Sequence, residues 1–157
     1  LSTACPTPPL MATGTLGEQQ LSRLPGLLQR AREDGLFRVV YLHHCPVPGL
    51  EKWRKRLTDA PQLQALLEEH GAELVLHGHG HRAHYSELPT RHGSLPVIAV
   101  PSASALGLHG ADIAHYNRYR VERANDGWQL RIEVRRYEAG SGRFTEGKGR
   151  RLRIDRR

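Results

Sequence analysis

The stretch that decides the fold is Ala72-Glu73-Leu74-Val75-Leu76-His77-Gly78-His79-Gly80-His81. Its first half is typical of a buried strand entered from a helix. Its second half carries three histidines at alternate positions. On an extended backbone every second side chain points the same way, so we expect His77, His79 and His81 to start on one face. Imidazoles that converge at the end of a strand can bind a divalent metal ion.

A second histidine pair, His43-His44, ends another apolar run at residues 37–42. The near-continuous apolar centre of this run suits a strand in a sheet covered on both faces. A helix capped by Thr58 or Asp59 and closed by Gly71 should separate the two strands. Strand, helix and strand in this order predict a parallel sheet. Ligands collect at the carboxyl ends of such strands, so the two histidine groups should meet at one edge.

The chain on either side of this unit gives weaker signals. Residues 1–4 are typical of the end of a strand. Thr15 and Glu18 have the spacing of a capping box at the start of a helix that Gly35 ends. Pro25 should kink or interrupt that helix.

The pattern changes in the C-terminal third. A short strand is expected at 96–100, after a loop at 82–96. Two strands with alternating character, 116–123 and 128–137, flank the turn Asn125-Asp126-Gly127. We therefore expect antiparallel pairing there.

Composition fits one soluble domain with a core. The chain has 157 residues, of which 38% are hydrophobic and 25% charged. It contains no apolar run of the roughly 20 residues that a membrane span needs, and no signal peptide is recognisable. Its two cysteines make no disulfide framework. These features predict a cytoplasmic protein with no membrane partner, and the leucine at position 1 predicts a fragment or a processed product.

The formal net charge of +7 is unevenly distributed. Residues 143–157 hold seven basic and two acidic side chains, a net +5, which leaves +2 for residues 1–142. We expect 143–157 to be a frayed basic tail that follows a domain ending at residue 142.

Two motifs carry a resemblance to a known family. The segment Gly78-His79-Gly80-His81 resembles the Gly-His-x-His motif of calcineurin-like metallophosphoesterases, and His43-His44-Cys45-Pro46 resembles the His-His-Pro-Pro segment upstream of it. The likeness spans roughly residues 1–100. It implies an α/β fold, the C-terminal half of an α/β/β/α four-layer sandwich whose sheets are part parallel and part antiparallel.

The resemblance also implies a function, which is the metal-dependent hydrolysis of phosphomonoesters or phosphodiesters at a site with two divalent ions such as Mn, Fe or Zn. By position, His79 resembles the ligand of one ion and His81 the ligand of the other, while His43 resembles a second ligand of the ion at His79. His44 is an alternative to His43, because Cys45 replaces the first proline. His44 and His77 are further candidates for support of the ligands or for contact with substrate.

Three motifs of the family do not occur in this sequence: Asp-x-His, Gly-Asp-x-x-Asp and Gly-Asn-His followed by an acid. In the family they supply a bridging aspartate, further ligands and a histidine that protonates the leaving group, so no catalytic residue is assigned here. We therefore expect this chain to represent the C-terminal half of the enzyme, to bind at most one ion weakly and to be inactive alone. Half of a sandwich exposes an apolar sheet face, through which we expect association.

Two other functions compete with this one. A nucleic-acid-binding module would explain the isoelectric point near 10 and the arginine-rich end. It is disfavoured because the charge is concentrated in the tail, aromatic residues make up only 6% and no recognition motif occurs. A structural zinc site could use a set of four side chains, namely His43, Cys45, His79 and His81. Substrate choice would lie in the loops, where phosphate could be contacted by Arg82, Arg91 and Ser102, although we expect each of these to be an ordinary loop residue.

Overall fold

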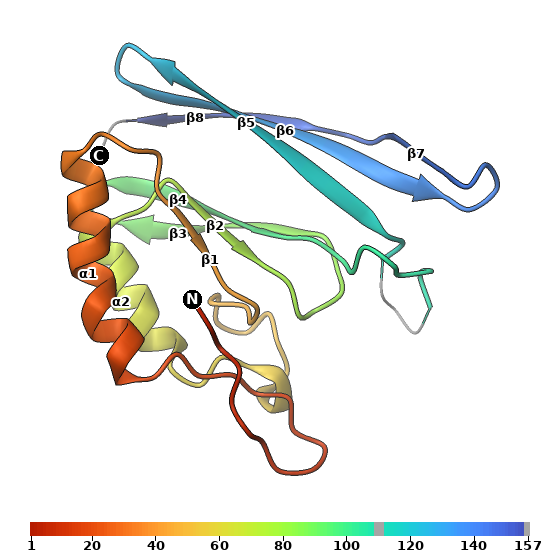
Figure 1. The fold of residues 1–157 in the computed structure, drawn as a ribbon, viewed down its shortest axis with the longest axis horizontal. Helices are drawn as coiled ribbons and strands as arrows, with labels where there is room; N and C mark the ends of the chain where they lie inside the picture. The colour runs from red at the N-terminus through yellow and green to blue at the C-terminus, as the bar shows by residue number, and fades with distance from the viewer. Residues whose placement is uncertain (109–111, 156–157) are drawn as a thin grey trace. The chain divides into compact units, whose positions relative to one another are not determined.

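The computed structural model describes residues 1–108 and 112–155, which fall into two compact units. The first unit comprises Leu1–Gly80 and His84–Ala99, and the second comprises His81–Ala83 and Val100–Arg157. Each unit contains its own sheet (Figure 1). Within the described residues, no helix is both long enough and apolar enough to cross a membrane.

The first unit combines helices with a mixed sheet. Its elements are α1 (Glu18–Glu33), β1 (Val39–Tyr41), a 3-10 helix (Trp53–Lys55), α2 (Ala60–His70), β2 (Leu74–His77), β3 (His84–Thr90) and β4 (Gly93–Ala99). The strand order is β1-β2-β4-β3. β2 pairs in parallel with both β1 and β4, whereas β3 is antiparallel to β4. The parallel pairing expected from the histidine-bearing strands is therefore confirmed.

The core of this unit lies between the sheet and its two helices, which lie side by side on one face (Figure 1). It is built largely from Leu24, Leu28, Val40, Leu63, Leu67, Val75, Leu95 and Val97. Burial of one such side chain stabilises the fold by about 1.5–3 kcal/mol. The expectation that β1 is covered on both faces is wrong, because Val39 is 47% exposed and Tyr41 is 70% exposed. β1 is an edge strand with only Val40 facing the core.

A buried ion pair connects the starts of β1 and β2. The Arg38 guanidinium contacts the Glu73 carboxylate through two hydrogen bonds, Nη2 to Oε1 at 2.7 Å and Nε to Oε2 at 2.9 Å. Both side chains are at most 4% exposed. The same guanidinium donates to the carbonyl of His70 at the end of α2. The starts of two strands and the end of a helix are thereby fixed to one another. Loss of either charge would leave the other charge buried and unpaired.

The start of α1 differs from the expected capping box. Thr15 donates its hydroxyl hydrogen to Asp59 at 2.9 Å rather than capping the helix, and the N-cap residue is Gly17, at φ 76°. α1 also continues through Pro25 without interruption. Leu24 and Leu28 on either side of that proline are buried in the core. Their packing therefore outweighs the hydrogen bond that the proline removes.

Residues 1–4 and 82–96 also differ from the structure that the sequence predicts for them. Residues 1–4 form no strand, although the amino group of Leu1 donates to the Tyr41 carbonyl at 2.9 Å. Most of the expected loop at 82–96 is strand, since β3 pairs with β4 from His84 opposite Ala99 to Thr90 opposite Gly93. β3 consists largely of polar residues and contains Pro89, so its sequence lacks the pattern of a strand. Its hydrogen bonds come from β4, which is an interaction outside the segment itself.

The second unit is an antiparallel sheet. It contains β5 (His115–Ala124), β6 (Gly127–Glu138), β7 (Arg143–Glu146) and β8 (Arg150–Asp155). The predicted β5–β6 hairpin is confirmed. β7 and β8 pair with successive parts of β6. The expectation of a frayed segment after residue 142 is therefore wrong for the described residues 143–155, while residues 156–157 lie outside them. Whether the domain ends at residue 142, and whether the two sheets stack as a four-layer sandwich, stay predictions.

Candidate metal-binding site

The candidate site lies at the carboxyl ends of two parallel strands in the first unit. His43 and His44 follow β1, and His77 is the last residue of β2. Because β1 and β2 are paired in parallel, both ends lie at the same edge of the sheet. The pairing extends beyond the strands, since Gly78 donates its backbone N–H to the His43 carbonyl at 3.0 Å.

His43 and His79 are brought together at this edge. Nε2 of His43 lies 3.0 Å from Nδ1 of His79, and the ring centroids are 4.9 Å apart. The His43 side chain is exposed and that of His79 is half-buried. The pair therefore presents two facing ring nitrogens at the surface of the unit, 36 residues apart in the chain.

Backbone conformation, rather than strand alternation, positions the second and third histidines of the motif. β2 ends at His77, and His79 has φ 64° while His81 has φ 55°. Non-glycine residues seldom adopt this left-handed region, and where they do the strain is often associated with function. The expectation of three histidines on one extended face is wrong for this reason. His81 is exposed and belongs to the second unit, so its place beside the pair stays a prediction.

His44 has a different environment from its neighbour. Its side chain is buried, with Nδ1 2.7 Å from the Thr3 hydroxyl and Nε2 3.1 Å from the Ala12 carbonyl. Burial lowers the pKa of His44, the hydrogen bond to Ala12 opposes this, and the charge of His43 lowers it further. Because both ring nitrogens have protein partners, His44 serves to hold the loop, and His43 is the histidine of the pair that remains open to a ligand.

His77 is a buried neutral imidazole. Burial lowers its pKa to about 4, with further lowering by His84 and His43 and an opposing contribution from the backbone of Gly78. Its Nδ1 lies 3.3 Å from the Gly78 carbonyl, and Nε2 is buried with no hydrogen-bond partner among the described residues. His77 is therefore a buried neighbour of the site, and its ring contacts the backbone of Gly78.

Cys45 is not in position to complete a zinc site. The thiol is buried, and the Val47 backbone N–H donates to Sγ at 3.4 Å. Burial raises the pKa of Cys45, the hydrogen bond with Val47 lowers it and the nearby Glu51 charge raises it again. Without a metal ion, such a thiol is protonated near neutral pH. In the described part of the chain, no cluster of three or more His, Cys, Asp or Glu side chains could hold a metal ion.

Glu51 is a neighbour of the site that the motifs did not identify. A Cβ atom placed on Gly80 would collide with Oε1 of Glu51. The Glu51 carboxylate thus lies against the backbone of the histidine loop, and Gly80 leaves the space for it. In the sequence, the contact is indicated only by the acidic character of Glu51 and by its place in the loop after His43-His44.

Of the three loop residues that could contact phosphate, one belongs to the first unit and two belong to the second. Arg91 lies in the turn between β3 and β4, at the start of β4. β4 runs parallel to β2, so Arg91 is at the sheet edge opposite His77, in the position of an ordinary loop residue. Arg82 and Ser102 belong to the second unit, where the Ser102 hydroxyl lies 3.2 Å from that of Ser104.

The donor set fits one divalent ion. Tetrahedral zinc would place two imidazole nitrogens about 3.4 Å apart, whereas an octahedral ion with bonds of about 2.1 Å at about 90° places them about 3 Å apart. The 3.0 Å between His43 and His79 meets this requirement. Without an ion, the same separation is a ring-to-ring hydrogen bond in which one of the two nitrogens carries the proton.

Comparison with known proteins agrees with this fold. No protein-family model and no curated protein matches the chain. Among solved structures, the chain is similar to a dimetal phosphatase from Danio rerio, with a TM-score of 0.57 and 14% sequence identity. The match covers 92% of this chain and 40% of the phosphatase chain. At this identity the likeness shows the fold alone, an α/β arrangement with parallel and antiparallel strands, over less than half of the phosphatase's length. The fold class expected from the sequence is confirmed.

Proposed function

We propose that this chain is part of a metal-dependent phosphoester hydrolase, in which His43 and His79 bind one divalent ion. The observation that carries the proposal is the 3.0 Å separation of two ring nitrogens from neighbouring strand ends. The metallophosphoesterase-like fold supports it, because a dimetal phosphatase shares that fold. His81 would bind a second ion, together with ligands that we expect from outside these 157 residues.

Each residue near the pair would have a defined task. A divalent ion bound here would activate water and stabilise negative charge on the phosphoester oxygens. His44, fixed by Thr3 and Ala12, holds the first strand end so that the neighbouring His43 ring keeps its position. The left-handed conformation of His79 turns its ring towards His43. Glu51 places a negative charge next to the same loop, which would favour a bound cation.

Metal titration of the chain tests this proposal. We expect calorimetry with Mn²⁺ or Co²⁺ to show about one ion per chain, because one nitrogen pair is available. Replacement of one ligand, in His43→Ala or in His79→Ala, should weaken binding by about tenfold or more. His70→Ala is the matched control, since it removes a histidine of the same unit at the end of α2, before β2 begins and away from the strand ends that carry the site. Cys45→Ser tests the zinc alternative and should leave the affinity unchanged.

Two results would contradict the proposal. One is equal metal affinity in the parent chain, His43→Ala and His79→Ala. The other is loss of binding in Cys45→Ser with retention in His79→Ala, which would indicate a thiolate site. We expect no turnover of an aryl phosphodiester by this chain alone, and Mn²⁺-dependent turnover by the protein when the remaining ligands are present.

A further inference from the structure

The second unit carries the entire formal charge of the protein. It holds fourteen of the 23 basic residues and seven of the 16 acidic ones, a net +7, whereas the first unit holds nine of each. Thirteen of the fourteen basic residues are arginines. The positive charge of residues 143–157 therefore belongs to a folded sheet, since the described part of this segment forms β7 and β8.

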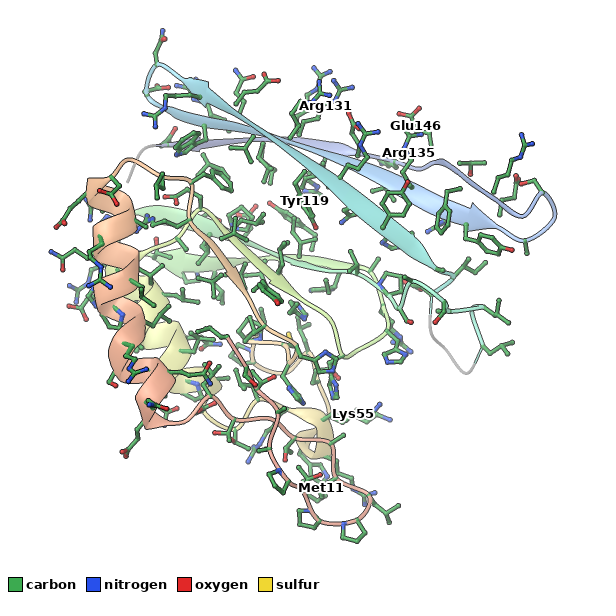
Figure 2. The ribbon with its side chains drawn as sticks, viewed as in Figure 1. Met11, Lys55, Tyr119, Arg131, Arg135 and Glu146 are labelled. Carbon is green, nitrogen blue, oxygen red and sulfur yellow. The ribbon has the colours of Figure 1, made fainter. Side chains whose placement is uncertain are left out.

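One face of that sheet holds almost half of these arginines. Strand pairing places six arginines on the same face, which we call the arginine face: Arg118, Arg120, Arg131, Arg135, Arg151 and Arg153. Figure 2 shows Arg131 and Arg135 on one side of the sheet and Tyr119 on the other. The opposite face carries Leu130, Ile132 and Ile154, each at most 5% exposed, together with four further arginines, namely Arg123, Arg136, Arg143 and Arg150.

Half of these arginines have no ion-pair partner on the face. Four acidic residues share it, namely Glu122, Glu133, Glu146 and Asp155. Glu133 pairs with both Arg118 and Arg131, at 3.4 and 3.3 Å. Arg153 pairs with Asp126 and Asp155. Among the described residues, Arg120, Arg135 and Arg151 have no ion pair, so their guanidinium groups are available to an anion.

Three aromatic rings lie at one end of the arginine face. Phe144 packs against Tyr116 and Tyr137, with ring centroids 5.1 and 5.5 Å apart. Phe144 is 43% exposed and Tyr116 is 44% exposed. Arg135 lies directly opposite Tyr116 in the strand register. Exposed rings beside free guanidinium groups can stack on bases while the arginines contact phosphates.

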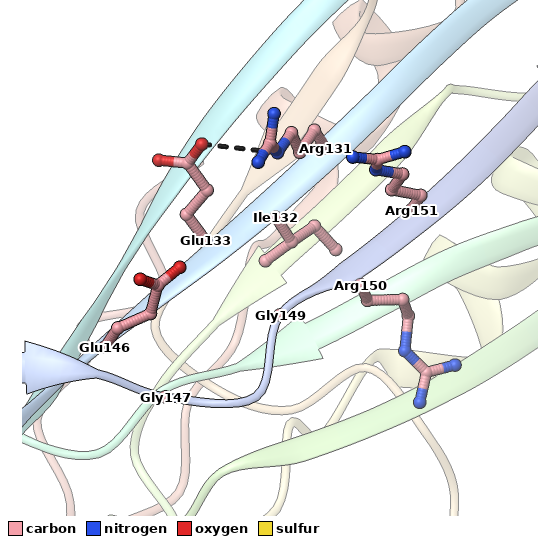
Figure 3. A pocket seen from close by; sticks show the side chains of 8 residues that line it. All are labelled: Arg131, Ile132, Glu133, Glu146, Gly147, Gly149, Arg150 and Arg151. Carbon is pink, nitrogen blue, oxygen red and sulfur yellow. Dashed lines mark ion pairs between the residues drawn. The ribbon is translucent and has the colours of Figure 1, made fainter.

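A pocket of about 220 Å³ lies where β7 leaves β6 and β8 joins it (Figure 3). Its lining includes Glu133 from the arginine face, and Ile132 and Arg150 from the opposite face. Its lining includes Arg131 and Arg151 on one side and Glu146 on the other. Gly149 lets the backbone pass close to β6, since a Cβ there would lie 2.6 Å from the Ile132 carbonyl oxygen.

We propose that the arginine face binds single-stranded nucleic acid, a role that does not depend on the metal site. Cationic side chains attract the phosphates, and the rings offer stacking surfaces that do not depend on base identity. An anionic membrane fits less well. The rings are held within strands and not on a projecting loop, and the described residues of this unit contain no amphipathic helix that could lie in a bilayer surface.

Fluorescence anisotropy with a labelled oligothymidylate of about 20 nucleotides tests this proposal across a salt series. Each phosphate contact should contribute about 0.7 to the slope of log affinity against log salt. Arg120→Ala/Arg151→Ala should therefore lower the slope by about 1.4. Arg23→Ala/Arg91→Ala is the matched control, because it removes the same charge from exposed positions of the first unit.

Loss of an aromatic ring should change the affinity for the oligonucleotide but not its dependence on salt. Phe144→Leu keeps an apolar side chain but removes the ring, so it should weaken binding about fivefold or more without a change in slope. The proposal is overturned if the Arg120→Ala/Arg151→Ala variant matches its control. It is also overturned if heparin or phosphatidylserine vesicles compete as well as the oligonucleotide and Phe144→Leu binds as tightly as the parent. Circular dichroism of each variant shows whether the sheet is intact, and the metal titration reports separately on the other site.

Discussion

Two adjacent histidines show how environment assigns a residue its role. His43 and His44 are chemically identical and occupy neighbouring positions after β1, yet one is exposed beside His79 and the other is buried with both nitrogens hydrogen-bonded. Both ring nitrogens of His44 are occupied by protein partners, so neither is open to a metal ion. The motif alone left both open, because the partners Thr3 and Ala12 are distant in sequence.

His115 predicts a loss of stability in mild acid. This first residue of β5 is 4% exposed. Burial lowers its pKa, the charge of Arg136 lowers it further, and Asp112 and the Ile113 backbone oppose this. Between the ordinary histidine value of 6.5 and the lowered native value, the unfolded chain binds a proton that the native chain does not. The contribution of neutral His115 to the free energy of unfolding is therefore complete above pH 6.5, the pKa of the unfolded chain. It is lost as the pH falls from 6.5 towards the lowered native pKa.

Urea unfolding at about pH 7.5 and about pH 5 measures this effect. The free energy of unfolding should decrease on acidification in the parent and decrease less in His115→Gln, which cannot be protonated. His77 adds a loss of the same sign, because its native pKa is about 4. His70→Gln serves as a control outside the two buried sites. Equal pH dependence in His115→Gln and the parent would show that His115 makes no contribution.

At the scale of elements, the two helices of the first unit share one carboxylate. Asp59 precedes α2, where the sequence predicts it as a cap, but its oxygens accept hydrogen bonds from the backbone N–H groups of Leu16 and Gly17. Thr15 adds its hydroxyl. The start of α1 is therefore satisfied by a residue 42 positions away from Gly17, and the two helix starts are fixed together.

Replacement of Asp59 tests this connection. Asp59→Ala removes a charged acceptor from buried donors, so we expect the free energy of unfolding to fall by about 3 kcal/mol. Asp59→Asn keeps one acceptor oxygen and should lose less. Asp34→Ala, at the exposed far end of α1, is the control. Chemical denaturation reads out all three, and a change of less than about 0.5 kcal/mol in Asp59→Ala would disprove the shared cap.

At the scale of the whole molecule, the exposed face of β1 predicts self-association. Val39 and Tyr41 lie on the side of this edge strand away from the core, at 47% and 70% exposure. Loss of about 60 Å² of apolar contact weakens association roughly tenfold. Tyr41→Lys should therefore raise the dissociation constant measured by sedimentation velocity at least that much. Exposed Leu27→Lys on α1 is the control, and an equal effect of both changes would place the contact elsewhere.

The sequence by itself determined the order of helices and parallel strands, the C-terminal hairpin and the position of two histidine groups at strand ends. These features depend on local periodicity, turn residues and glycines, which a short window of sequence contains. Gly35 and Gly71 end their helices as expected for this reason, at φ 64° and 67°.

Only the tertiary structure decided the remaining features. β3, β7 and β8 are polar segments whose backbone groups find partners on β4 and β6. The choice between His43 and His44, the role of Asp59 and the common face of the arginines all depend on residues far away in the chain. Hydrogen bonds and ion pairs of this kind form only when distant segments meet, so no local pattern encodes them.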